Sequence, residues 1–405
     1  PASLVLNWAE ECQKFTPELS CVVVDGDVAH RAELAESWPA ADLVVTSYDL
    51  LRRDEALYEG QEFYACILDE AQAIKNHTTQ KYKAVCKVRS RVRFALTGTP
   101  VENRLGELWS IFSFLMPGYL PPYKSFCSRF EKPIVQEEDQ TAVRRLNQLT
   151  GPFILRRMKS DVLKELPPKT ENVYRIELEE EQRKLYLAAV VDAREKLRAA
   201  KPEDKMAVFA VLMRLREICC DPRLIADNWE GGSAKLDACA ELVSSAVEGG
   251  HRILLFSQFT SMLELLAKRL DAEGISHFTL QGSTPKPVRA ELVRRFNGGE
   301  VSVFLISLRA GGTGLNLTAA DIVIHYDPWW NVAAQNQATD RAYRIGQQNP
   351  VQVYKLIAQD TIEEKIVELQ QAKQSLADTV TGTADGAILS MRPDELLQLL
   401  EGSEP

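Results

Sequence analysis

The stretch Cys66-Ile67-Leu68-Asp69-Glu70-Ala71-Gln72 joins a short apolar run directly to an acidic pair. Such a run, ended at once by polar residues, is typical of a buried strand that stops at one edge of a parallel sheet. Three more runs of this kind lie in the first 115 or so residues, with helical patterns between them: Val22-Val23-Val24, Leu43-Val44-Val45 and Phe94-Ala95-Leu96. This alternation predicts an α/β domain with crossover helices.

A second series of apolar runs begins near Gly250 and predicts a second α/β lobe. Its strands are expected at 253–256, 278–280, 303–306, 322–324 and 351–354. The region between the two series, roughly residues 105 to 228, carries long apolar stripes at helical spacing and is expected to be mostly helical. Within it, Pro167-Pro168 favours an extended connection.

These patterns divide the chain into four parts. We expect a first lobe at 1–165, with a helical protrusion from about residue 105, and a helical linker at 166–228. The second lobe is expected at 229–375 and a C-terminal segment at 376–405. That segment ends in a short amphipathic helix from Pro393 to Leu400, which we expect to pack back on a lobe as a brace. A mobile end is the alternative.

The composition is that of an intracellular globular protein. The 405 residues are 45% hydrophobic and 26% charged, and no apolar run approaches the roughly 20 residues of a transmembrane helix. The start has no signal-peptide pattern. Eight cysteines occur without the Cys-x-x-Cys pairs of zinc sites, so we expect reduced thiols. The net charge of −9 neither supports nor excludes a nucleic acid partner.

Two strand ends in the first lobe carry candidate chemistry. Asp69 and Glu70 directly follow a predicted strand, where one carboxylate can hold a magnesium ion and the other can orient a water molecule. The next predicted strand leads into Thr97-Gly98-Thr99-Pro100, whose hydroxyls can sense a phosphate. Taken alone, each pattern also fits an ordinary solvated turn.

In the second lobe, glycines 311, 312 and 314 follow the predicted strand at 303–306. They would let backbone amides approach an anion closely. A dinucleotide-binding loop is disfavoured because Leu317 stands where its third glycine would be. Further on, Arg341 and Arg344 are three residues apart and would share one face if this segment is helical, where two guanidinium groups suit a phosphoryl group. Surface charges are the alternative interpretation.

In their order along the chain, these strings resemble the motifs of the Swi/Snf-type branch of superfamily-two helicases. The resemblance runs over nearly the whole sequence, and Tyr326-Asp327-Pro328-Trp329-Trp330-Asn331 is its most specific string. The other matching strings are Pro1-Ala2-Ser3-Leu4 with Asn7-Trp8, Thr46-Ser47-Tyr48, Asp69-Glu70-Ala71-Gln72, Leu96-Thr97-Gly98-Thr99-Pro100 with Glu102-Asn103, Leu255-Phe256-Ser257-Gln258-Phe259, Gln281-Gly282-Ser283-Thr284, Gly311 to Leu317 and Gln337 to Gln347.

The resemblance implies two RecA-like lobes that bind ATP and Mg²⁺ and move along double-stranded DNA without separating its strands. It implies a catalytic set of Asp69, Glu70, Gln337, Arg341 and Arg344, with Asp69 also serving the metal. It implies nucleotide contacts for Gly312, Gly314 and Asp340, and DNA contacts for Thr46, Ser257, Gln258, Thr284 and Thr313. It implies coupling roles for Thr97, Gly98, Thr99, Trp329 and Trp330, although simple packing is an alternative for the two tryptophans.

One family motif is missing. The family's phosphate-binding loop, Gly-x-x-x-x-Gly-Lys-Ser/Thr, lies upstream of the motif with which this sequence starts, and no glycine in the sequence is followed by lysine. That loop holds the β- and γ-phosphates of ATP. We therefore expect a fragment of a longer protein that hydrolyses ATP poorly or not at all by itself. The absent segment should include a central strand, so the first lobe should expose apolar surface and be poorly stable.

Two other functions remain open at this point. A non-enzymatic DNA-binding module is disfavoured because Asp69, Glu70, Arg341 and Arg344 are all retained. An RNA helicase is disfavoured by Gln72 and by the tryptophan pair. Chromatin, a stalled polymerase or a repair intermediate would each fit as the DNA-bound partner. A bacterial cytoplasm is favoured over a nucleus because the sequence has no long Lys/Arg-rich run.

Overall fold

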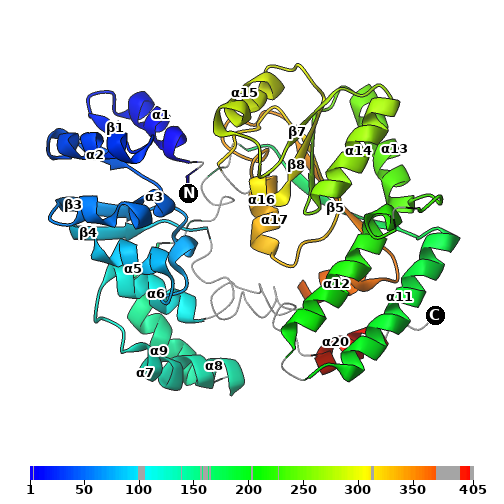
Figure 1. The fold of residues 1–405 in the computed structure, drawn as a ribbon, viewed down its shortest axis with the longest axis horizontal. Helices are drawn as coiled ribbons and strands as arrows, with labels where there is room; N and C mark the ends of the chain where they lie inside the picture. The colour runs from blue at the N-terminus through cyan, green and yellow to red at the C-terminus, as the bar shows by residue number, and fades with distance from the viewer. Residues whose placement is uncertain are drawn as a thin grey trace. The chain divides into compact units, whose positions relative to one another are not determined.

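A computed structural model describes residues 1–2, 4–98, 105–137, 139–155, 157, 163, 166–201, 204–226, 228–311, 314–370 and 393–401. The chain forms two compact units. Unit 1 comprises Pro1–Arg157, and unit 2 comprises Met158–Leu376 together with the C-terminal helix. Both units are α/β, as the sequence predicts (Figure 1).

The four strands expected in unit 1 are present, but they pair differently from the prediction. β1 (Cys21–Val23) pairs with β2 (Leu43–Val45), and β3 (Glu62–Leu68) pairs with β4 (Arg89–Ala95), both in parallel. The two pairs are not hydrogen-bonded to each other, so the expected single sheet is two ribbons. Both ribbons nevertheless contribute to one apolar core that includes Val24, Trp38, Leu68, Ile74 and Phe114.

One face of the β3–β4 ribbon is apolar and open to solvent. Ile67 pairs with Phe94 across the ribbon, and their exposed fractions are 56% and 54%. Val92, on the same face of the ribbon, and Leu96, just beyond β4, are exposed as well. Apolar side chains in a row along a ribbon create an aggregation-prone surface. The exposed face agrees with the expectation that the first lobe shows apolar surface.

Polar side chains cap some of the helices of unit 1, and the helices form two groups. Side chains of Asp27, Ser47, Thr79 and Asp139 each accept a hydrogen bond from a backbone N–H in the first turn of the helix that follows. The first group comprises α1 (Val5–Phe15), α2 (Val28–Ser37), α3 (Tyr48–Arg53), α4 (Glu55–Tyr58) and α5 (Gln80–Lys87). The second, which has its own apolar cluster and corresponds to the expected protrusion, comprises α6 (Leu105–Leu115), α7 (Tyr123–Phe126), α8 (Lys132–Gln136) and α9 (Gln140–Thr150).

Unit 2 is built on a six-stranded parallel sheet with the order β5-β10-β9-β6-β8-β7. All five strands expected in the second lobe are confirmed. They are β6 (Ile253–Ser257), β7 (His277–Leu280), β8 (Val303–Ser307), β9 (Ile322–His325) and β10 (Val351–Ala358). Every residue of β6, β8 and β9 is buried, which is the continuous apolar pattern of central parallel strands.

The sixth strand is a correction to the sequence analysis. β5 (Lys169–Ile176) lies inside the stretch 166–228 that was expected to be a helical linker, yet it pairs in parallel with β10 along its whole length. Most of its residues are polar and exposed, as is usual at a sheet edge. A hydrogen bond of 2.8 Å from Lys355 Nζ of β10 to Glu171 Oε2 of β5 helps to hold the edge in place.

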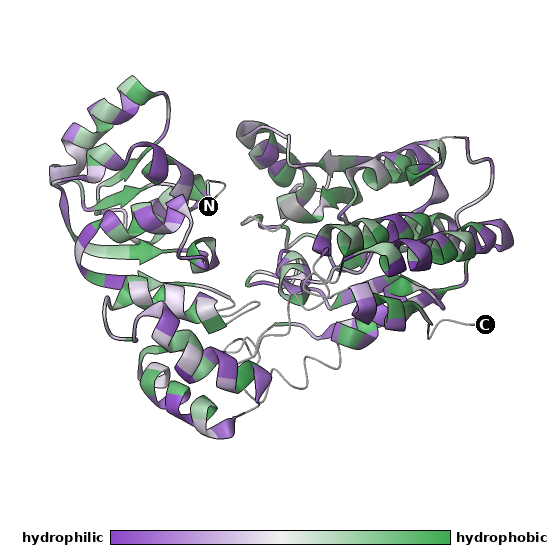
Figure 2. Ribbon diagram, turned by 60° about the horizontal axis from the view of Figure 1, so that its bottom comes forward, coloured by the Kyte–Doolittle hydropathy of each residue, from purple (hydrophilic) through white to green (hydrophobic). Residues whose placement is uncertain are grey.

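Helices cover both faces of this sheet and alternate hydrophilic with hydrophobic residues along their length (Figure 2). Alternate strand residues face different cores: Leu255 and Leu305 pack with α13 (Ala234–Glu248) and α14 (Thr260–Ala272), whereas Phe256 and Ile306 lie in a second cluster with Phe296. The remaining helices of the unit are α11 (Glu180–Ala199), α12 (Lys205–Cys220), α15 (Lys286–Asn297), α16 (Leu308–Gly311), α17 (Val332–Thr339) and α20 (Pro393–Glu401).

The C-terminal helix α20 packs against α11 and α12, as expected of a brace. Leu396 and Leu400 of α20 are buried in the same apolar cluster as Tyr186 and Leu212. Arg194 Nη2 also donates a hydrogen bond of 2.7 Å to the carbonyl oxygen of Leu400. The helix therefore belongs to the folded body of unit 2.

Replacing Leu396 with alanine is expected to lower the free energy of unfolding of unit 2 by about 2 kcal/mol. The side chain is fully buried, and its loss leaves a cavity, although a surface helix can partly adjust. Chemical denaturation monitored by circular dichroism would measure the change. Gln398→Ala, on the exposed face of the same helix, serves as the control and should change stability by less than about 0.5 kcal/mol. Equal effects of the two substitutions would contradict the packing described here.

Among the described residues, no helix is long and apolar enough to cross a membrane. The structure shows all eight cysteines as free thiols.

Candidate functional site

The acidic pair of unit 1 lies directly after β3, and hydrogen bonds hold its first member, Asp69. Trp8 Nε1 donates to Asp69 Oδ2 at 2.8 Å, and the backbone N–H of Glu70 donates to Asp69 Oδ1 at 2.9 Å. The hydroxyl of Tyr48 donates to the carbonyl oxygen of Asp69 at 2.9 Å. Residues from α1, α3 and the strand end thus fix both the carboxylate and the backbone of Asp69.

Glu70 adopts a backbone conformation that non-glycine residues rarely take. Its φ of 51° lies in the left-handed region, so the chain turns sharply after β3. Strain of this kind is often found at functional sites, where surrounding contacts maintain it. A contact of this sort is present, because Gln72 Nε2 donates to Glu70 Oε2 at 2.6 Å.

Gln72 connects the two strand ends of the β3–β4 ribbon. Thr97 Oγ1 donates to Gln72 Oε1 at 2.9 Å, so a chain of side chains runs from Thr97 through Gln72 to Glu70. Gln72 belongs to one of the strings that resemble the family motifs and argues against an RNA helicase, but no role in the site was predicted for it. Its spacing of two residues from Glu70 was the available signal.

The donor set at this strand end fits a magnesium ion. Carboxylate oxygens are the ligands that Mg²⁺ prefers, and the ion is usually held by one or two carboxylates together with substrate phosphates. Among the described residues, no group of three or more His, Cys, Asp or Glu side chains could hold a metal ion by itself.

Three other residues of unit 1 were expected to take part in DNA contact or coupling, and the structure describes two of them. Thr46 lies directly after β2, and its hydroxyl oxygen is buried. Gly98 follows Thr97 in a bend, and a side chain at this position would meet open space. Thr99 lies outside the described residues.

In unit 2, the loop after β8 and the segment after α17 meet through the backbone. The N–H of Leu317 donates to the carbonyl oxygen of Arg341 at 3.0 Å, and Gly314 has a positive φ of 58° that suits glycine. The side-chain amide of Gln347 donates to the carbonyl oxygens of Ala320 and Ala342. The structure thus brings together two strings that are separate in the sequence. Gly312 and Thr313 lie outside the described residues.

The expectation that Arg341 and Arg344 share one helical face is wrong. α17 ends at Thr339, and both arginines lie in the turns that follow. Gln337 lies within the helix and Asp340 is its C-terminal cap residue. Arg341 is 8% exposed, so its guanidinium is largely buried within unit 2, whereas Arg344 is partly exposed.

A buried histidine holds the end of α17 against the sheet. His325, the last residue of β9, stacks on Phe256, and its Nε2 lies 2.8 Å from Thr339 Oγ1. Burial, assisted by the nearby positive charge of Lys355, lowers the pKa of His325 to about 3. The ring is therefore neutral at pH 7.

The residues expected at the DNA backbone lie at the carboxyl ends of two strands. Ser257 ends β6 and is buried, and its hydroxyl donates to Asp327 Oδ1 at 2.6 Å. Gln258 is partly buried beside Met213. Thr284 closes the turn after β7, where its hydroxyl accepts a hydrogen bond from the N–H of Gln281.

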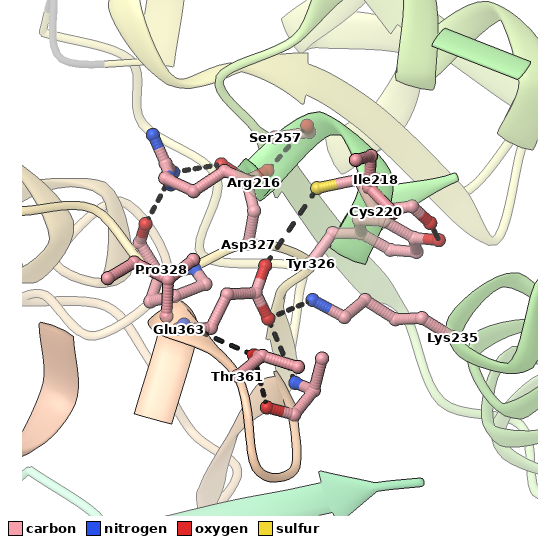
Figure 3. A network of polar contacts seen from close by, with 12 residues as sticks. Arg216, Ile218, Cys220, Lys235, Ser257, Tyr326, Asp327, Pro328, Thr361 and Glu363 are labelled. Carbon is pink, nitrogen blue, oxygen red and sulfur yellow. Dashed lines mark hydrogen bonds and ion pairs between the residues drawn. The ribbon is translucent and has the colours of Figure 1, made fainter. Parts of the chain in front are cut away.

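The two adjacent tryptophans pack inside unit 2. Trp329 and Trp330 have ring centroids 5.3 Å apart, and Trp330 is 5% exposed in the cluster formed by α11, α12 and α20. Arg216 of α12 lies over the Trp330 ring at 4.4 Å. Figure 3 shows the polar network in which Arg216 takes part. The sequence analysis did not identify this arginine.

Two family models match the chain. The model of the SNF2-related domain matches residues 1–224, and that of the helicase conserved C-terminal domain matches residues 234–346.

Curated relatives match nearly the whole chain. It is 38% identical to an uncharacterised ATP-dependent helicase of Mycoplasma genitalium, with 99% of the chain and 38% of the relative aligned. It is 39% identical to the putative ATP-dependent helicase/translocase YwqA of Bacillus subtilis over 98% of the chain and 44% of that protein. A SWI/SNF-related regulator of chromatin from Mus musculus is 35% identical over 99% of the chain and 40% of its own length. The chain thus spans less than half the length of these relatives.

Two solved structures are also similar. The SWI2/SNF2 ATPase core of Sulfolobus solfataricus in complex with double-stranded DNA has a TM-score of 0.50 and 35% sequence identity, and the alignment covers 98% of this chain and 84% of that one. The SWI2/SNF2 ATPase core domain of the same organism has a TM-score of 0.51 and 34% sequence identity, and the alignment covers 99% of this chain and 82% of that one.

Proposed function

Since the chain belongs to the SNF2-related family, we propose that it forms part of an ATP-driven motor that moves along double-stranded DNA. The observation that carries this proposal is the hydrogen-bonded chain Thr97–Gln72–Glu70 at the ends of β3 and β4. It fixes a carboxylate next to Asp69, which supports the assignment of one carboxylate to an attacking water molecule and of the other to a metal ion.

In the proposed reaction, Glu70 orients a water molecule and takes up its proton during attack on the γ-phosphate. Its carboxylate is suited to this role because Gln72 fixes one oxygen, Oε2. Asp69 would hold the magnesium ion, which would neutralise charge on the phosphates. Trp8 and the backbone N–H of Glu70 keep the Asp69 carboxylate oriented for this task.

We also assign nucleotide contacts to residues of unit 2. We assign phosphate contacts to Gln337, Arg341 and Arg344, because arginine donors stabilise the charge that develops on a transferred phosphoryl group. Gly312, Gly314 and Asp340 would contact the nucleotide. Because both arginines lie in turns after α17, their positions depend on the contacts of Arg341 with Leu317 rather than on a helix.

A DNA substrate is supported by the similarity to a core that was solved with double-stranded DNA, and by the relative described as a translocase. We assign DNA contacts to Thr46, Gln258, Thr284 and Thr313, and to the turn that begins at Ser257. Since the hydroxyl of Ser257 is used within the protein, its part in DNA binding would come through the backbone of that turn. A DNA-bound complex such as chromatin or a polymerase would be the ultimate target.

The 405-residue sequence contains no Gly-x-x-x-x-Gly-Lys-Ser/Thr loop. Without the loop's amides and lysine, the β- and γ-phosphates lack their usual ligands. We therefore propose that the chain binds DNA but turns over ATP weakly unless such a loop is supplied by a longer form of the protein.

The test compares ATP turnover by the 405-residue chain and by a longer form that carries the loop, each with and without duplex DNA. We expect DNA-stimulated turnover only in the longer form, and binding of both forms to duplex DNA that weakens as salt is raised. DNA-stimulated turnover by the 405-residue chain would overturn the role given to the loop. Binding without turnover in either form would instead indicate a non-enzymatic DNA-binding module.

A further inference from the structure

A fully buried arginine links three segments of unit 2. Arg216 lies on α12, and its Nη2 donates to Asp327 Oδ2 at 3.1 Å and to the carbonyl oxygen of Pro328 at 2.6 Å. Both ionised side chains are completely inaccessible to solvent. The arginine thereby fixes the segment that leads from β9 toward α17.

The same aspartate fixes the turn after β6. Asp327 Oδ1 accepts hydrogen bonds from Ser257 Oγ at 2.6 Å and from the N–H of Gln258 at 3.2 Å. β6 and β9 are neighbours in the sheet, so both segments lie at the carboxyl edge where α/β sheets bind ligands. One carboxylate therefore joins the turn 257–259 to the segment 327–330, with Arg216 behind it (Figure 3).

Aromatic rings surround the guanidinium. Its carbon atom lies 4.4 Å from the ring centroid of Trp330, 5.5 Å from that of Phe259 and 5.9 Å from that of Trp329. Cation–π contacts of this kind compensate a buried charge only in part. They also fix the rings relative to Asp327, since the same guanidinium touches both.

Three buried polar atoms in this cluster lack hydrogen-bond partners within the described part of the chain, which is unusual for an ion pair that serves only the stability of the fold. Nε and Nη1 of Arg216 and Oε1 of Gln258 are buried without a hydrogen-bond partner among the described residues. By contrast, the nearby buried pair Lys235–Glu363 leaves no such atom, and Glu363 also accepts from the N–H of Ala358. Because unpaired buried donors are costly, stability alone does not account for Arg216.

We propose that Arg216 is a positioning residue for DNA binding. It holds Asp327, and through it the turn 257–259, so that Gln258 and the backbone of the turn face the DNA phosphates in one orientation. This inference rests on the proposed function, because it assumes that the turn contacts duplex DNA.

The test measures the dissociation constant for duplex DNA of the 405-residue chain. The main variant is Arg216→Met combined with Asp327→Asn, which removes both charges and leaves no unpaired ion. The dissociation constant is expected to rise at least tenfold. The matched control is Lys235→Met combined with Glu363→Gln, the same change at the other buried pair, which should leave the constant within twofold. Comparable effects of the two variants would overturn the proposal.

A double-mutant cycle separates positioning from a general loss of structure. Added to Gln258→Ala, the Arg216/Asp327 variant should weaken binding by no more than a further twofold to threefold, because both changes act on the same contact. Full additivity would overturn the proposal. If the main variant does not fold, the dissociation constant of Arg216→Lys tests the proposal instead. It keeps the charge but loses the planar contact with Trp330, and the constant is expected to rise at least threefold.

Failure of this inference and failure of the proposed function give different results. If the unchanged chain does not bind duplex DNA, both the proposed function and this inference are wrong. If the unchanged chain binds DNA and both Arg216 variants bind equally well, only the role of Arg216 is overturned.

Discussion

ATP turnover is expected to fall about a hundredfold or more when Glu70 is replaced by glutamine in a form of the protein that hydrolyses ATP. Glutamine has nearly the same shape, but it cannot take up a proton from the attacking water. Since the left-handed turn and the contact with Gln72 position this carboxylate, the loss should appear in the turnover number rather than in nucleotide affinity. Steady-state kinetics at saturating duplex DNA would measure it.

Glu62→Gln is the matched control for this substitution. Glu62 begins β3, the strand that ends just before Glu70, and its side chain is exposed. We expect the control to change the turnover number by less than about twofold, as is usual for an exposed surface position. A Glu70→Gln protein that retains at least a third of the parent's turnover would rule out Glu70 as the group that activates water.

Acid is expected to destabilise unit 2 below pH 6.5 through His325. Because burial lowers the pKa of this side chain to about 3, the unfolded chain binds a proton at a pH where the folded protein does not. Stability should therefore be intact above pH ~6.5 and fall by about 1.4 kcal/mol for each pH unit down to roughly pH 3. The loss would be on the order of 2 to 3 kcal/mol at pH ~4.5.

His325→Gln should remove this part of the pH dependence while leaving an amide that can bond to Thr339. Urea unfolding of both proteins at pH ~7 and pH ~4.5 would give the difference in slope. His277→Gln, at the start of β7, makes the same substitution elsewhere in unit 2 and is the control measured in parallel. Parallel pH profiles for the parent and His325→Gln would show that His325 is not the group responsible.

The sequence predicts strands well where their burial is complete. β6, β8 and β9 are unbroken apolar runs, and their bounds agree with the prediction to within about one residue. β5 was missed because its polar residues resemble a loop, and only pairing with β10 makes it a strand. The split of unit 1 into two ribbons was missed for a related reason, since hydrogen bonding between strands is not encoded in their composition.

The position of a candidate site residue was predictable where the residue directly follows a strand. Asp69 and Glu70 follow an apolar run, which is a local signal, and the structure adds the contacts from Trp8, Tyr48 and Gln72. Arg341 does not lie on a helical face, because α17 ends before it. Its carbonyl oxygen instead accepts a hydrogen bond from the N–H of Leu317. Arg216 was missed because one arginine in a helical pattern looks like a surface charge, and its burial depends on residues more than 100 positions away.

The edge strand β5 bears on how such proteins can be recombined during evolution. The helicase C-terminal family model begins at residue 234, yet the sheet of unit 2 takes a strand from residues 169–176, and α11 and α12 form much of one of its apolar clusters. A genetic exchange at the family boundary would leave β10 with a bare edge and Trp330 without its packing partners on α11 and α12. For the second lobe to keep its complete sheet and apolar cluster, the exchange point must therefore lie upstream of β5.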